Sequence, residues 1–200
     1  MHPDAPCLTI TLPQAKAAGF ASLLQHGILF AVDGPVAIRP FLLSLPGFSA
    51  DYIEGAVQTI FINGVAADSL DKPLAAGSTL ALSAAMPGLA GAIFRKQGAH
   101  GSLRSRQVGD AAPAGAEAGF LTLKLFNSIA ADRVLDLTSR GVLLQGKAVR
   151  EFAARRPDLF QPPADLSLDS RAMEYAELMT AIEVLPMVAI RLHCQDETAS

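Results

Sequence analysis

The sequence has little of what marks several classes of protein. Its 200 residues include no tryptophan and only two cysteines, and charged residues make up 18% of the chain. Two cysteines cannot form the disulfide framework of a small secreted protein. The first residues lack the basic and apolar regions of a secretory signal, so we expect a cytoplasmic protein. Because half of the residues are hydrophobic, the composition excludes wholesale disorder.

The small net charge hides an uneven distribution. Residues 1–71 carry six acidic and two basic side chains, and residues 158–200 carry eight and two. In contrast, residues 72–109 carry five basic side chains and no acidic one. The net charge of -3 is therefore the balance between acidic ends and a basic middle. Such a separation favours contacts with an anionic partner at the middle segment.

Hydrophobic periodicity predicts an α/β chain of the α+β type with two small units. Residues 107–119 are rich in glycine, proline and alanine, as linkers are, and divide the chain into a unit over 1–106 and a unit over 120–200. Asp169 or Ser170 is the expected cap of a helix over 171–181. The remaining expected helices cover 14–25, 41–45 and 147–155, with a further helix ending over 134–139, and the expected strands cover 7–12, 28–32, 57–62, 79–84, 120–126, 142–144 and 184–193.

One part of the N-terminal unit resembles a known family. A strand ending in Asn63-Gly64 leads through a polar loop to a Gly-polar-apolar strand, residues 76–82. This pattern, over roughly residues 57–86, resembles ubiquitin-like β-grasp domains, in particular the sulfur-carrier proteins of thiamine and molybdopterin synthesis. Those carriers end in Gly-Gly, whose carboxylate is adenylated and thiolated. Pro87-Gly88 stands at that point here and the chain continues, so the resemblance implies the fold without the carrier activity.

The sequence also contains a possible internal repeat. Residues 60–66 and 142–148 both place an amide residue and a glycine after three apolar residues. Either the two halves are related by duplication, or a common strand-and-turn pattern occurs twice by chance.

The strongest candidate site is a basic cluster between Gly91 and Gly109. Arginines form bidentate contacts with carboxylates and phosphates, and glycines let backbone amides approach an anion closely. The cluster could bind an anionic small molecule, RNA, an acidic partner or the acidic C-terminal unit of its own chain, or it could be a solvated loop. Nucleic acid is disfavoured because no aromatic residues alternate with the basic ones. The cluster consists of Arg95, Lys96, His100, Arg104 and Arg106.

No motif nominates a catalytic residue, a cofactor site or a metal site. Residues 47–51 lack the closing glycine of G-x-S-x-G, and no phosphate-binding glycine motif is present. The possible metal ligands, His2, Cys7, His193 and Cys194, lack metal-binding spacing. A Cys7–Cys194 disulfide would require the terminal strands to be neighbours. Four acidic residues are expected in a loop, a cap and a solvated helix face: Asp165, Asp169, Glu174 and Glu177.

Residues 73–94 carry no charge, but proline and glycine interrupt them, so they predict a buried strand and a loop rather than a membrane span. We therefore expect a non-enzymatic binding or accessory protein that contacts a protein partner, or a second copy of itself, through the basic cluster. The alternative is an enzyme or cofactor-pathway component that binds an anionic small molecule at the same arginines.

Overall fold

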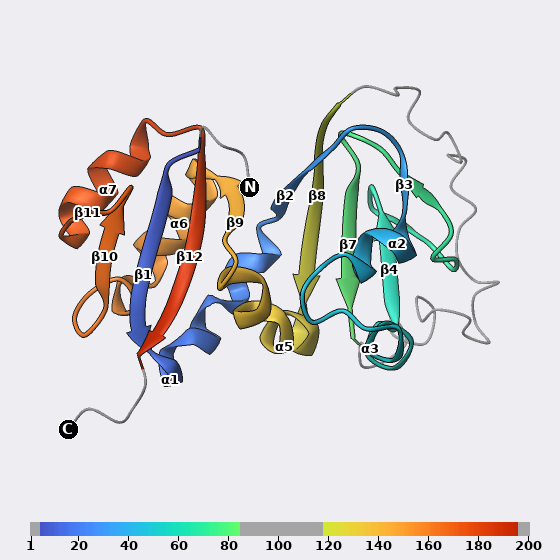
Figure 1. The fold of residues 1–200 in the computed structure, drawn as a ribbon, viewed down its shortest axis with the longest axis horizontal. Helices are drawn as coiled ribbons and strands as arrows, with labels where there is room; N and C mark the ends of the chain where they lie inside the picture. The colour runs from blue at the N-terminus through green and yellow to red at the C-terminus, as the bar shows by residue number, and fades with distance from the viewer. Residues whose placement is uncertain (1–4, 85–117, 196–200) are drawn as a thin grey trace. The chain divides into compact units, whose positions relative to one another are not determined.

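The computed structural model describes residues 5–84 and 118–195, which form a mixed α/β protein (Figure 1). The chain divides into two compact units: unit 1 is Met1–Leu29 with Ala131–Ser200, and unit 2 is Phe30–Ala130. This division differs from the predicted one, because each unit combines residues from both predicted halves. Residues 107–117 of the predicted linker lie outside the described residues.

Unit 1 is built on a mixed sheet with the strand order β11-β10-β1-β12-β9. β1 lies parallel to β12 and antiparallel to β10, and β9 lies antiparallel to β12. The strands are β1 (Cys7–Pro13), β9 (Val142–Gln145), β10 (Asp165–Leu168), β11 (Arg171–Ala172) and β12 (Met187–Gln195). The helices are α1 (Gln14–Ala17), η1 (Ala18–Gln25), α6 (Gly146–Arg155), η3 (Pro157–Leu159), α7 (Tyr175–Glu183) and most of α5 (Asn127–Thr138).

In unit 2 the strands follow the order β2-β8-β7-β4-β5, in which β7 and β8 are parallel and β4 is antiparallel to β7. A two-stranded sheet joins β3 to β6. The strands are β2 (Ile28–Val32), β3 (Val36–Ala37), β4 (Thr59–Ile62), β5 (Val65–Ala66), β6 (Pro73–Leu74), β7 (Thr79–Ser83) and β8 (Gly119–Phe126), and the helices are α2 (Ile38–Leu43) and α3 (Ala50–Ala56).

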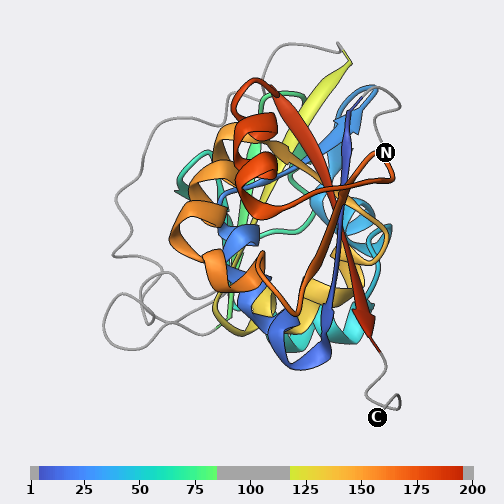
Figure 2. The same cartoon turned by 90° about the vertical axis from the view of Figure 1, so that its left-hand side faces the viewer.

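Alternation along β1 explains how unit 1 forms its core. Leu8, Ile10 and Leu12 are fully buried, whereas the residues between them are half-buried. Because successive side chains of a strand point to opposite faces, these three lie on one face of the sheet. α6 and α7 cover one face of this sheet, as the two views agree (Figure 2). In the same unit, the rings of Phe20, Phe152 and Phe160 pack together with centroids 5.5–5.9 Å apart.

The first strands of the two chain halves are alike and are exchanged between the units. Residues 8–14, Leu-Thr-Ile-Thr-Leu-Pro-Gln, correspond to residues 121–127, Leu-Thr-Leu-Lys-Leu-Phe-Asn, and each segment leads directly into a helix. β1 pairs in parallel with β12, whereas β8 pairs in parallel with β7. In each unit the two parallel strands therefore come from different predicted halves of the chain.

The possible repeat at residues 60–66 and 142–148 does not correspond to equivalent elements. β4 continues through Asn63-Gly64 into an antiparallel hairpin with β5. β9 instead continues directly into α6. The two similar stretches therefore begin different supersecondary structures.

The structure confirms most predicted strands, including the pairing of residues 59–62 with 80–83. The predicted helix over 171–181 is wrong at its start, because Asp169 and Ser170 have positive φ values of 49° and 68° and form the turn between β10 and β11. α7 begins only at Tyr175. The last strand begins at Met187 rather than Val184, which is the C-cap of α7.

Helix α3 was not predicted, although its start has a recognisable signal. The side chain of Ser49 accepts a hydrogen bond from the backbone N–H of Tyr52 at 3.1 Å. Such a cap satisfies one of the free N–H groups at a helix start. Ser49 was considered only as part of a nucleophile motif, so this signal was missed.

Gly146 provides a test of close packing in unit 1. A Cβ at this position would overlap the carbonyl oxygen of Leu185, whereas a Cβ at Gly55 in α3 would meet open space. We expect Gly146→Ala to lower the free energy of unfolding by about 1–3 kcal/mol through overpacking. Gly55→Ala should raise it by about 0.4–1 kcal/mol, since alanine restricts the unfolded chain. Urea denaturation of both variants measures the difference, and equal effects would contradict the packing argument.

Candidate functional site

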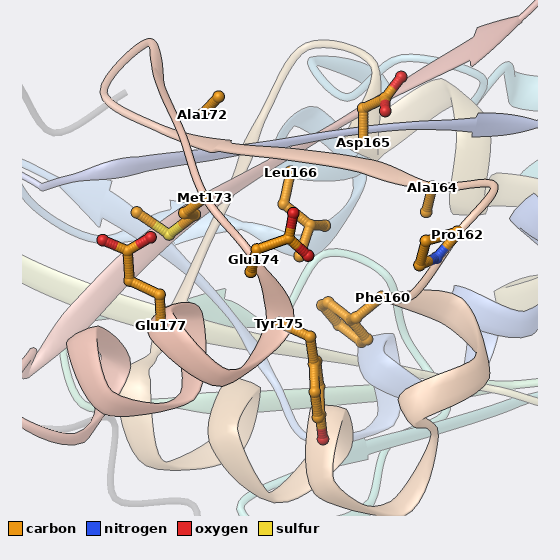
Figure 3. Close-up of a pocket in the computed structure, with 10 residues that line it drawn as sticks. All are labelled: Phe160, Pro162, Ala164, Asp165, Leu166, Ala172, Met173, Glu174, Tyr175 and Glu177. Carbon is orange, nitrogen blue, oxygen red and sulfur yellow. The ribbon is translucent and has the colours of Figure 1, made fainter.

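Unit 1 contains a pocket of about 330 Å³ beside the first turn of α7 (Figure 3). Its walls come from the chain between η3 and β10, from β10 itself and from the segment that leads from β11 into α7. Ten residues line it: Phe160, Pro162, Ala164, Asp165, Leu166, Ala172, Met173, Glu174, Tyr175 and Glu177. A volume at the low end of ligand pockets suits a single side chain or a small molecule.

The apolar lining of the pocket is held by the core of unit 1. Phe160 and Leu166 are buried, and the Phe160 and Tyr175 rings lie 6.5 Å apart at 46°. The Tyr175 hydroxyl donates a hydrogen bond to the backbone oxygen of Ala153 in α6 at 3.0 Å. The backbone N–H of Met173 donates to the oxygen of Leu166 at 3.0 Å. These contacts tie the start of α7 both to α6 and to β10.

Carboxylates provide the charge at the pocket. Glu174 and Glu177 lie on the α7 side of the pocket, whereas the carboxylate of Asp165 points away from them (Figure 3). Glu174 is the N-cap residue of α7, and Glu177 lies in its first turn. The positive end of the helix dipole favours negative charge at both positions. The site therefore offers an apolar wall and negative charge to a cationic group.

One guanidinium already contacts this charge. Arg171 of β11 donates from Nη2 to Oε1 of Glu177. The carboxylates of Asp165 and Glu174 have no hydrogen-bond or ion-pair partner within residues 5–84 and 118–195. The pocket thus combines one neutralised glutamate with one that is available for a ligand.

A second carboxylate in unit 1 has a structural role outside the pocket. The Arg156 guanidinium donates two hydrogen bonds of 3.1 Å to Asp158. This interaction lowers the pKa of Asp158 and raises the pKa of Arg156 from their ordinary values. The backbone oxygen of Asp158 also accepts a hydrogen bond from Lys16 at 2.8 Å. These groups connect α1 to η3 on the surface.

The predicted site residues Arg95, Lys96, His100, Arg104 and Arg106 lie outside the described residues. The predicted acidic residues are separated by the fold. Asp169 accepts a hydrogen bond from the backbone N–H of Cys7 in the β10–β11 turn, whereas the other three line the pocket. Sequence reasoning had placed them in a loop and on a solvated helix face and had missed the pocket. The signal that a sequence could offer is weak, because acidic first turns are common on solvated helices.

The cysteines are too far apart for a disulfide. β1 and β12 are neighbours, but Cys7 is in register with Ala189 and Cys194 with Leu12. Five residues of strand separate the two positions by about 16 Å, beyond disulfide reach. Partial burial raises the pKa of the Cys194 thiol, so it stays protonated at neutral pH. Within the described ranges, no three His, Cys, Asp or Glu residues form a group that could hold a metal ion.

None of the helices described here is long and apolar enough to cross a membrane. The uncharged stretch over 73–94 is described only as far as residue 84, where it forms β6 and β7. No protein-family model, curated protein or solved structure matches the chain. The functional argument therefore depends on the pocket itself.

The hydroxyl of Tyr175 gives a test of how the pocket wall is held. Tyr175→Phe keeps the ring but removes the hydrogen bond to Ala153. We expect the free energy of unfolding to fall by about 1 kcal/mol, the usual net contribution of such a bond. Urea denaturation measures this change. An unaltered stability would mean that the hydroxyl does not hold α7 against α6.

Proposed function

We propose that this chain is a non-enzymatic binding protein that takes a cationic side chain of a protein partner into the pocket of unit 1. The observation that carries the proposal is the placement of Glu174 beside an apolar wall formed by Phe160, Leu166 and Met173. A lysine or arginine side chain has the same two parts, an apolar stem and a charged end. Its stem contacts the wall while its charge meets the carboxylates.

The limited size of the pocket favours recognition of one side chain over binding of a large cofactor. A cofactor-sized ligand usually occupies a larger, deeper cavity. The site opens beside β11, a two-residue strand at the edge of the sheet, where a partner chain has access. A contact centred on one side chain involves few residues, and such a small contact area suits a transient interface.

We also propose that unit 2 is a ubiquitin-like β-grasp unit in which β8 takes the place of the first strand. The support is the parallel β7–β8 pair, flanked by the antiparallel strand β4, and the Asn63-Gly64 turn after β4, with positive φ at both residues. A β-grasp module recognises partners through surfaces rather than through a fixed chemistry. This proposal therefore agrees with a binding function.

The pocket proposal predicts a selective effect of Glu174→Gln. We expect a fluorescein-labelled peptide with three arginines spaced by glycines to bind the wild type, measured by fluorescence anisotropy. Removing the Glu174 charge should weaken binding about two- to five-fold, because exposed ion pairs contribute about 0.2–1 kcal/mol. A peptide with glutamates in place of the arginines should not bind.

Glu183→Gln is the matched control. Glu183 lies at the far end of α7, pairs with Arg150 at 3.2 Å, and its loss changes the net charge equally. Equal weakening in both variants would indicate nonspecific attraction, and it would overturn the pocket proposal. Binding that neither variant weakens would do the same.

A second proposal concerns the basic cluster, whose residues lie outside the described part of the chain. We propose that Arg95, Lys96, Arg104 and Arg106, with His100, contact an acidic protein partner. The support is the absence of any acidic residue from positions 72–109 of the sequence. Arginines there can form bidentate contacts with carboxylates.

Replacing the four arginine and lysine residues of the cluster by serine tests this second proposal. We expect a polyglutamate-coated resin to retain the wild type and the Glu174→Gln variant but not the serine variant. Unchanged capture by the serine variant would contradict the proposal. If an anionic metabolite raises the melting temperature and Arg104→Ser abolishes the shift, the alternative of a small-molecule site gains support instead.

A further inference from the structure

The chain itself places one arginine at the pocket. The guanidinium of Arg171 contacts Glu177, while 72% of the Arg171 side chain and 43% of the Glu177 side chain remain exposed. Exposed ion pairs are weak, about 0.2–1 kcal/mol, so an incoming cation can replace Arg171 at low cost. Arg171 therefore neutralises the Glu177 carboxylate but does not itself line the pocket.

The position of Arg171 is set by the turn before it. Asp169 and Ser170 both have positive φ, which non-glycine residues adopt at a cost of about 1 kcal/mol or more each. Two hydrogen bonds hold this turn: Cys7 N–H to Asp169 Oδ1 at 2.8 Å and Asp169 N–H to the Cys7 oxygen at 3.0 Å. In the resulting hairpin Arg171 is in register with Leu168. The fold thus presents the guanidinium at one fixed place on the rim.

The chemistry of the pocket favours a planar cation. A guanidinium presents several N–H groups in one plane and stacks on aromatic faces, whereas an ammonium is a strongly hydrated point charge. Here Glu174, Tyr175 and Glu177 all line the pocket, and Glu177 already holds a guanidinium. Another arginine, Arg150 of α6, pairs with Glu183 at the end of α7, and neither of these residues lines the pocket. Arg171 is distinguished from Arg150 by the adjoining cavity.

We infer that the partner side chain recognised by the pocket is an arginine, and that Arg171 is its intramolecular competitor, which holds Glu177 until the ligand guanidinium replaces it. This inference rests on the proposed function, since it names the side chain that the pocket takes. It assigns Arg171 to specificity rather than to stability. Loss of Arg171 should free Glu177, so that both glutamates become available to the ligand.

The test uses the full chain with ¹³C-labelled methionine methyl groups. N-acetyl-L-arginine amide is titrated into the protein, and the shift of the Met173 methyl, assigned through Met173→Leu, reports occupancy of the pocket. The lysine and citrulline derivatives are titrated in parallel. Citrulline retains the shape of arginine without its charge. We expect arginine to bind more tightly than lysine, and citrulline to produce no saturable shift.

Arg171→Ala should increase the affinity for the arginine derivative about two- to five-fold, which corresponds to the cost of displacing an exposed ion pair. Arg150→Ala is the matched control and should leave the affinity unchanged. Unaltered methyl shifts of Met179 and Met187 would show that Arg171→Ala leaves unit 1 folded, and Arg171→Gln provides a second variant if they move.

An affinity that falls or stays the same in both Arg171 variants would overturn the inference, as would equal binding of lysine and arginine. If the arginine derivative still shifts Met173 in a Glu174-dependent way, the proposed function survives that result. If no cation shifts Met173 in any variant, the proposed function and the inference both fail.

Discussion

Parallel strand pairing is the constraint on which both units depend. A parallel pair cannot be closed by a tight turn, because the chain must return to the same end of the sheet before the second strand begins. In unit 1 the partners are β1 and β12, and in unit 2 they are β7 and β8. β1 supplies Leu8, Ile10 and Leu12, three of the fully buried side chains of unit 1. Without this strand, β10 and β12 would have no common neighbour.

The pocket depends on the same strand, although no residue of β1 lines it. β10 forms its ladder with β1, with Leu166 opposite Ile10. The turn after β10 is held through Asp169 and Cys7. These contacts fix the hairpin that carries Arg171 and the chain that leads into α7. The geometry of an apparently local site, residues 160–177, is therefore set by the beginning of the sequence.

The dependence of the pocket on β1 explains which parts of the structure could be predicted from the sequence. Buried and less buried residues alternate along most of β1, β7 and β8, so the local sequence pattern was sufficient to predict these strands. Asp169 and Ser170 were misread because aspartate and serine favour both helix caps and turns, and only the pairing with β1 decides between them. The pocket was not predictable for the same reason. Its acidic residues were visible in the sequence, but the concave shape comes from strand pairing between distant segments.

The exchange of β1 and β8 also orders the events of synthesis. Unit 2 has all of its described strands once the ribosome has passed Phe126, whereas β1 must wait for β12 to be translated. During that interval Leu8, Ile10 and Leu12 have no completed sheet to enter. Contacts of such long sequence separation are slow to form and leave apolar strands open to aggregation. The polar Thr9 and Thr11 between them are half-buried in the finished sheet, and they interrupt the apolar run of the unpaired strand.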